Sequence, residues 1–571
     1  MMSVLSRLDS FVSNLKIPLL HGLNNFLSNH KITHWIESFF ADHKKVLWLA
    51  TILGVFMFII TMLFATSIYN DATLYANMSY AFSIGDWQRA FVDSAPPLFP
   101  VLSGLICKLG VPVYYATLTV GSIFFILTIF PLYFFLCCFT DKKYAAWGCL
   151  FYILAPKMIR FGCAGLQEGG RNFFVISSLC LIFSFFYNRK IFKLVLLGIA
   201  LAGFTLIRSE GIAFVPLTLF CVILLVLKKS DYKFNIVFFR NSIVYCLIIL
   251  AACVATLSPR IYQVHEETGY FETDTRQVGA IKEYIKVFES NKNNNVQPLN
   301  ITKESKKVKQ VSRLDKIFSL SFFGNFINNF SRGTYELYEV LLALGLIILI
   351  KRKKWTMEYS LIVLFVLINA GIFYLVSSNA YRYFIINILI FMPFTLIGYR
   401  EFLRSFSKYN LRYIFLVAVF IVAIFQIING LQNSLDNSKS FQKNIGYWIS
   451  KNIKPEEKGD VVTVLAGWYP QFAFFAGANS GIINNIFINK KLSGTDGRLK
   501  LTAELINKGF HADELYSSIK LYPNKKIIKP NVIVIAKPRD HIKFIKGLKN
   551  FKNLKFINTE WNKDAVIFKV L

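Results

Sequence analysis

The chain has 571 residues, of which 54% are hydrophobic and 16% aromatic, and its mean hydropathy is +0.46. This composition excludes an ordinary soluble multidomain protein and indicates a polytopic α-helical membrane protein. The formal net charge is +31. Lysines and arginines cluster in short gaps between apolar runs, which is typical of membrane topology and not of a nucleic-acid-binding protein.

The chain begins with a polar, mixed segment, residues 1–45, that lacks the pattern of a cleavable signal peptide. We expect it to be cytoplasmic and to lie on the membrane surface. The first apolar run then acts as an uncleaved anchor. The runs predict about 11 spans, with a range of 11–13, in a transmembrane domain over 46–430, at 46–68, 113–137, 144–156, 172–187, 191–207, 211–227, 241–257, 335–350, 359–376, 383–399 and 411–429.

Basic residues occupy alternate gaps between these runs, at 142–143, 189–190, 228–229, 351–354 and 400–408. The positive-inside rule places those gaps in the cytoplasm. The remaining gaps are then extracytoplasmic, including a first external loop at 70–112 and a long external loop at 258–334. This topology requires that 95–110 does not span. Its short apolar stretch begins with two prolines, which favours a surface-lying or re-entrant helix.

The tail, residues 431–571, differs from the rest of the chain. Segments rich in valine and isoleucine predict strands at 460–466, 531–537 and 565–570, with helical segments between them. We therefore expect an extracytoplasmic α/β domain without catalytic motifs, with a supporting role or a role in contacting a ligand. All nine cysteines lie in the first 260 residues, without metal-ligand spacing.

Several ionisable residues collect in the extracytoplasmic gaps, where their position at the edge of the membrane suggests a function. They are Asp71, Glu168, Arg208, Glu210 and Arg382. Acids that can act as a base, beside arginines that can hold a phosphate, suit chemistry on a phosphorylated lipid.

Each of these residues also has a plainer interpretation. Asp71 could cap a helix that begins at Ala72, and Glu168 could be a solvated loop acid. Arg208 and Glu210 could pair only with each other. Arg382 could anchor the chain at the membrane interface. Arg160 and Arg171 are ambiguous.

The loop "NDATLYANMSYAFSIGDWQRAFVDSAPPLFPVLSGLICKLG" resembles the first external loop of type C glycosyltransferases. The similarity is to the branch of protein mannosyltransferases and lipid A aminoarabinose transferases. It rests on Asp71 and Tyr75, on the Gly-Asp-Trp at 85–87 and on the Pro-Pro-Leu at 96–98. The family's usual second acid is replaced by Ala72, and Glu168 stands where an aspartate is commoner, so a metal requirement is left open.

The resemblance implies an inverting glycosyltransferase that moves a sugar from a polyprenyl-phosphate donor to an extracytoplasmic protein, lipid A or envelope glycan. Asp71 and Glu168 are then the catalytic candidates, and the substrate-binding candidates are Tyr75, Arg208, Glu210 and Arg382. No cofactor is certain, and a divalent metal ion is an open alternative. The Lys-, Asn-, Ile- and Phe-rich composition favours a bacterial inner membrane. An envelope polysaccharide polymerase or ligase and a non-enzymatic lipid-sugar transporter are the alternative functions, although a transporter would be expected to show internal repeats.

Overall fold

The computed structural model describes residues 38–64, 68–91, 95–273 apart from 270, 336–376, 381–408 and 440–454, with short stretches and single positions at 327–331 and from 421 to 571. The expected segment 1–45 and the span at 411–429 therefore lie almost wholly outside the described residues. Within the described residues, six helices are long and apolar enough to cross a membrane by length and composition. They fit a multi-pass membrane protein.

Helices stand at the other ten expected spans, where long apolar runs predicted them. They are α4 (His43–Phe64), α8 (Val113–Leu127) with α9 (Ile129–Cys137), α10 (Lys142–Leu154), α12 (Glu168–Asn188), α13 (Phe192–Ile207), α14 (Gly211–Lys229), α15 (Ile236–Thr268), α19 (Glu336–Lys351), α20 (Met357–Val376) and α21 (Ile386–Lys408). Several of them are shorter than a bilayer requires, so the count of 11 spans stays a prediction.

Close helix crossings depend on small residues. A Cβ atom at Gly345 would lie 1.9 Å from the carbonyl oxygen of Phe394, and one at Gly398 would lie 1.9 Å from that of Leu341. Helices α19 and α21 therefore pack backbone against backbone, and a side chain at either glycine would force them apart.

Helix α15 continues to Thr268, so the first residues of the expected long external loop, from 258, are helical, and their extracytoplasmic position stays a prediction. Its last turns are held by Arg260, whose guanidinium donates to the carbonyl oxygen of Ala95 at 3.2 Å. Gln263 Nε2 likewise donates to the carbonyl oxygen of Phe91 at 3.0 Å. These tertiary contacts stabilise the last turns of the helix, which the polar sequence after residue 257 did not predict.

Side-chain contacts sort the gaps between helices into two groups. The ion pair between Lys228 Nζ and Glu358, at 2.6 Å, and the pair between Arg352 and Glu401, at 2.7 Å, join the ends of α14, α19, α20 and α21. We call this the basic end of the bundle. At the opposite end lie the gaps before α5, before α12 and between α13 and α14, and we call it the α5 end.

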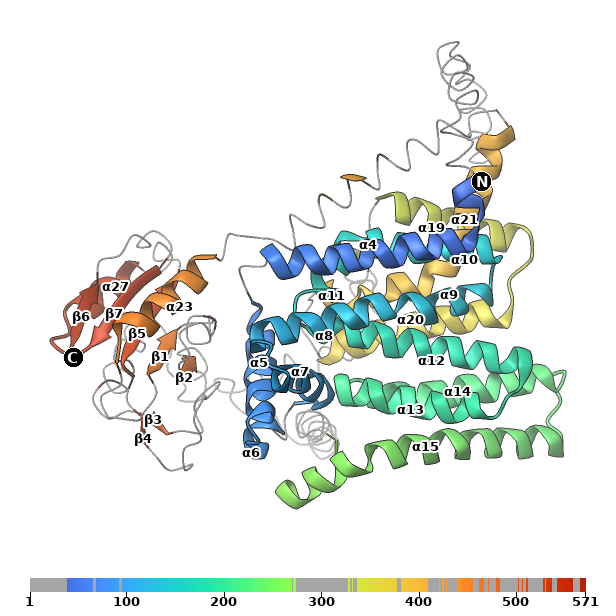
Figure 1. Ribbon diagram of the computed structural model, residues 1–571. Helices are drawn as coiled ribbons and strands as arrows, with labels where there is room; N and C mark the ends of the chain where they lie inside the picture. The colour runs from blue at the N-terminus through green and yellow to red at the C-terminus, as the bar shows by residue number, and fades with distance from the viewer. Residues whose placement is uncertain are drawn as a thin grey trace, which may run out of the picture.

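Three short helices cover the α5 end. They are α5 (Asn70–Ser83), α6 (Trp87–Ala90) and α7 (Leu98–Lys108). Figure 1 shows α5 running across the ends of the long helices and not along them. Helix α7 is too short to span a bilayer. This agrees with the expected topology, which requires that 95–110 does not span. One more short helix, α11 (Pro156–Gly162), links α10 to the loop before α12.

The tail contains a five-stranded sheet in the order β2-β1-β5-β7-β6. Its strands are β1 (Thr463–Ala466), β2 (Asn479–Ile482), β5 (Val532–Ala536), β6 (Leu554–Ile557) and β7 (Ala565–Val570), and a separate pair is formed by β3 (Phe510–His511) and β4 (Ile527–Ile528). The three expected strands coincide with β1, β5 and β7. The first three strands of the sheet pair in parallel, whereas β7 is antiparallel to its neighbours.

Two helices accompany the sheet, α23 (Ser440–Asn452) and α27 (Ile542–Lys549). Ile445 and Ile449 of α23 are fully buried against Val464, Val534 and Ile567 of the strands. In Figure 1 the sheet lies beyond the α5 end of the bundle.

Candidate active site

Asp71 lies in the first turn of α5, where the partial positive charge of the helix favours an acid. The helix begins at Asn70, two residues earlier than a cap at Asp71 would require, and no side chain caps it. The carboxylate instead accepts a hydrogen bond from Arg382 Nη2 through Oδ2. Its side chain is 41% exposed. The capping interpretation of Asp71 is therefore wrong.

Glu168 opens α12 and its side chain is only 3% exposed. Its Oε1 lies 3.2 Å from Arg208 Nη1 and 3.7 Å from Arg382 Nε. The interpretation of Glu168 as a solvated acid is wrong, because burial of a carboxylate requires such partners.

Glycines set the position of Glu168. A Cβ atom at Gly169 would lie 2.6 Å from the carbonyl oxygen of Gly121, and one at Gly121 would lie 2.8 Å from that of Gly162. The start of α12 thus packs directly on the backbones of α8 and α11. Gly169 therefore allows close packing of helices, and it does not serve the approach of a ligand.

Arg208 and Glu210 lie in the tight gap between α13 and α14. They form two hydrogen bonds, from Arg208 Nη2 to Glu210 Oε1 at 2.8 Å and from Nε to Oε2 at 3.2 Å. Burial alone would raise the pKa of Glu210, but the charge and hydrogen bonds of Arg208 outweigh it and lower this pKa to about 2. Because Arg208 also reaches Glu168, its pairing is not restricted to Glu210.

Arg382 belongs to a short 3-10 turn, Tyr381–Tyr383, immediately before α21. It bridges Asp71 and Glu168, and its Nη2 also donates to Tyr383 Oη at 2.8 Å. Burial would lower the pKa of Arg382, but Glu168 and Asp71 outweigh that effect and raise it above its ordinary value. The interpretation of Arg382 as only an interfacial anchor is therefore wrong.

A buried arginine holds this turn from behind. Arg171 is 1% exposed, and its two terminal nitrogens donate to the carbonyl oxygens of Tyr383 and Arg382, each at 3.3 Å. The aromatic ring of Tyr383 lies 4.8 Å from the guanidinium carbon of Arg208 and 4.9 Å from that of Arg382. The ring thus lies against both guanidinium groups, where its π face attracts them.

Tyr75 lies one turn after Asp71 on α5, and its hydroxyl donates to Gln167 Oε1 at 2.9 Å. Gln167 is 3% exposed and immediately precedes Glu168. The bond therefore ties the helix that carries Asp71 to the residue beside Glu168. The ring of Tyr75 packs edge-on against Phe99 at 5.8 Å, which connects this link to α7.

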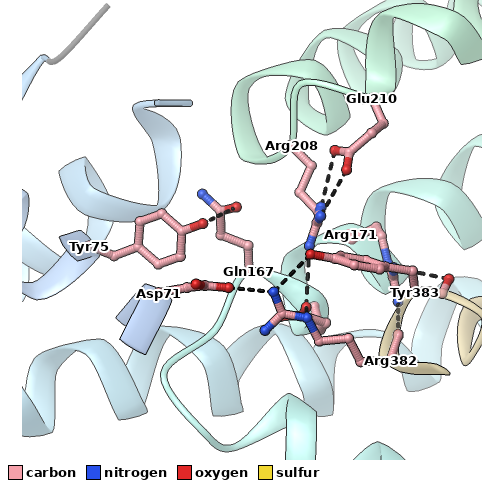
Figure 2. Close-up of polar contacts among 9 residues, drawn as sticks. Asp71, Tyr75, Gln167, Arg171, Arg208, Glu210, Arg382 and Tyr383 are labelled. Carbon is pink, nitrogen blue, oxygen red and sulfur yellow. Dashed lines mark hydrogen bonds and ion pairs between the residues drawn. The ribbon is translucent and has the colours of Figure 1, made fainter. Parts of the chain in front are cut away.

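Charges alternate along this network (Figure 2). The acids Asp71, Glu168 and Glu210 balance the arginines Arg382, Arg208 and Arg171. Exposure falls inward, from 41% for Asp71 and 22% for Arg382 to 11% for Arg208. Only the pair of Asp71 and Arg382 is thus substantially open to ligands.

A divalent ion would meet competition in this arrangement. Within the part of the chain that the structure describes, no group of three or more His, Cys, Asp or Glu side chains could hold a metal ion. Both Asp71 and Glu168 already contact Arg382. A divalent ion at these carboxylates would have to displace Arg382, and a metal requirement stays an untested alternative.

The structure brings all six predicted site residues to the α5 end. Five form the charged network, whereas Tyr75 joins it through Gln167. Sequence reasoning missed Gln167 and Tyr383 and left Arg171 unassigned. An arginine three residues after Glu168 in an apolar helix was the available signal for Arg171, because an ionisable group there needs a partner.

No protein family matches the chain in sequence, and no curated protein does. Solved structures do match its fold. ArnT from Cupriavidus metallidurans bound to undecaprenyl phosphate covers 91% of this chain, which covers 97% of ArnT, with 11% identity and a TM-score of 0.56. The same protein in its apo state gives a TM-score of 0.53 at 12% identity and the same coverage.

A second match is the archaeal oligosaccharyltransferase AglB from Archaeoglobus fulgidus, in complex with an inhibitory peptide and a dolichol-phosphate. It covers 91% of this chain, which covers 74% of AglB, at 12% identity and a TM-score of 0.50. ArnT, a lipid A aminoarabinose transferase, and AglB are both type C glycosyltransferases. The expected resemblance to type C glycosyltransferases is thus confirmed at the level of the fold.

Proposed function

We propose that this protein is an inverting glycosyltransferase that uses a polyprenyl-phosphate sugar as donor and modifies an extracytoplasmic acceptor. The observation that carries the proposal is the junction of Asp71, Arg382 and Glu168, contributed by three separate elements at the α5 end. The fold shared with ArnT and AglB, whose structures contain undecaprenyl phosphate and dolichol-phosphate, supports the donor class. The α5 end then faces away from the cytoplasm, in a bacterial inner membrane.

Asp71 is the proposed base. Arg382 donates to its Oδ2, and among the described residues none donates a hydrogen bond to Oδ1. A water-borne acceptor hydroxyl can therefore reach Oδ1 and transfer its proton there. The hydroxyl oxygen attacks the anomeric carbon as the bond from that carbon to the phosphate oxygen breaks, which inverts the anomeric configuration.

The leaving group is the polyprenyl phosphate, which departs with the bonding electron pair and gains negative charge. Arg382 is the arginine that can stabilise it, because its fork matches phosphate oxygens and its side chain is twice as exposed as that of Arg208, 22% against 11%. An arriving phosphate competes with the more exposed carboxylate, Asp71, for Arg382. Glu168 keeps the guanidinium in place during this exchange.

Purified protein in lipid nanodiscs, supplied with a polyprenyl-phosphate sugar and a panel of protein, lipid A and glycan acceptors, tests the proposal. We expect transfer to one acceptor class, release of polyprenyl phosphate, and a product of inverted anomeric configuration by NMR. A product that retains the configuration would refute the direct displacement. Extension of a glycan chain would favour the polymerase or ligase alternative, and movement of the lipid-linked sugar between leaflets without transfer would favour a transporter.

A further inference from the structure

The tail contacts the start of the helix that carries the proposed base. Gln471 lies between β1 and β2 in sequence and is 1% exposed. Its Nε2 donates to the carbonyl oxygen of Ile68 at 3.0 Å and to Oδ1 of Asn70. One amide group of the tail thus binds the residues on both sides of Tyr69, immediately before Asp71.

A second contact shows that the tail approaches the same end of the bundle at another point. Lys443 Nζ of α23 lies 5.9 Å from the centre of the Tyr114 ring at the start of α8. Gln471 is therefore presented to α5 by a tail that also contacts α8.

The chemistry of this contact depends on donation. Helix α5 has no side-chain cap of its own. Both groups that Gln471 binds are acceptors, and among the described residues its own Oε1 has no hydrogen-bond partner. Both acceptors lie at the start of α5, so the two bonds attach the tail to the first turn of this helix.

We propose that Gln471 is a positioning residue for catalysis, through which the tail fixes the first turn of α5 and so the carboxylate of Asp71. The inference rests on the proposed function and assigns the tail a part in the same reaction. A displacement of a reacting group by about 1 Å can lower turnover on the order of 10²-fold, so loss of this contact acts on the chemical step. Donor binding through Arg382 does not depend on it.

Two substitutions of Gln471 separate donation from mere bulk. Gln471→Glu keeps the shape but sets a carboxylate oxygen against two acceptors, whereas Gln471→Lys keeps hydrogen-bond donors. We expect Gln471→Glu to lower kcat about tenfold or more with the donor KM within about twofold of wild type, and Gln471→Lys to restore most of kcat. Equal kcat losses in both variants, or a normal kcat in Gln471→Glu, would overturn the proposal.

Hydrogen–deuterium exchange supplies a readout that needs no activity. Backbone amides at 70–75 should exchange about tenfold or more faster in Gln471→Glu than in wild type, and Gln471→Lys should restore slow exchange. Unchanged exchange in Gln471→Glu would show that the contact does not fix α5. If the wild-type protein is inactive on the donor but the two variants show this exchange pattern, the proposed function is refuted and the contact is still established.

Discussion

Replacing Asp71 by asparagine removes the charge of the proposed base and keeps its shape. The residue is not the cap of α5, so the helix start is retained. The lost interaction is the ion pair with Arg382, whose carboxylate partner is 41% exposed. Such a pair contributes about 0–1 kcal/mol to stability because water screens it. We expect the melting temperature of the detergent-solubilised variant to fall by about 2 °C or less.

Turnover should respond very differently. A positioned base contributes on the order of 10²–10⁴ in rate, which corresponds to about 3–5 kcal/mol of transition-state stabilisation at 1.36 kcal/mol per tenfold. The donor KM should stay the same or fall, because Arg382 loses a competing carboxylate. Initial rates of polyprenyl phosphate release at varied donor concentration, measured with purified wild-type and Asp71→Asn proteins, separate kcat from KM.

Asp86 offers a matched control on the same loop. Its carboxylate also pairs with an arginine, Arg89, at 2.6 Å, and it caps α6. Asparagine caps about as well as aspartate, so Asp86→Asn should fold and keep normal turnover. Turnover within about threefold of wild type in Asp71→Asn, or equal losses in the two variants, would refute the assignment of the base.

Four further predictions follow from the same geometry. Glu168→Gln should lose turnover and also about 1–3 kcal/mol of stability in thermal unfolding, since it removes the buried carboxylate that Arg208 and Arg382 share. Arg382→Lys should raise the donor KM or lower kcat, and Arg382→Ala more so; unchanged kinetics in both would move phosphate binding to Arg208. Glu210 has a pKa lowered to about 2, so its stabilising effect is complete above pH 4.5 and is lost only as the pH falls toward 2. The melting-temperature difference between wild type and Glu210→Gln should therefore be constant from pH 5 to 9. In a protein without native cysteines, a thiol reagent should label Lys142→Cys from the cytoplasmic side, and Ser290→Cys and Lys500→Cys from the outside. Labelling of position 500 only from the cytoplasmic side would refute the topology.

The helices were predictable from the sequence because a long apolar run favours a membrane-spanning helix whatever its tertiary contacts are. Sequence reasoning missed the last turns of α15, which are polar and are held by Arg260 and Gln263 against the backbone at 91 and 95. Those bonds join positions about 165–172 residues apart, and no local pattern reports them. Tertiary contacts thus override the local signal at the end of a span.

The site residues were predictable for the same reason that spans were, since a charge beside a hydrophobic run is conspicuous. Their pairing was not. Arg382 and Asp71 are separated by 311 residues, and Gln471 and Asn70 by 401. Which acid meets which arginine depends on backbone approaches such as that of Gly169 to Gly121, which are set by the three-dimensional crossing of helices.

The graded exposure of the network connects stability with chemistry. Glu168 and Arg208 are buried, so each needs the other's charge to avoid a large desolvation cost, and substitution of either affects folding and activity together. Asp71 and Arg382 form the exposed edge, and in the proposed reaction their pair is weak enough to exchange for substrate. A phosphate that arrives at this edge can take Arg382 from Asp71 without unpairing an inner charge. The loss of stability in Glu168→Gln can therefore be compared with the loss in Asp71→Asn. A much larger loss in Glu168→Gln places Glu168 in the fixed, buried part of the network, and an equal loss places it at the exchangeable edge.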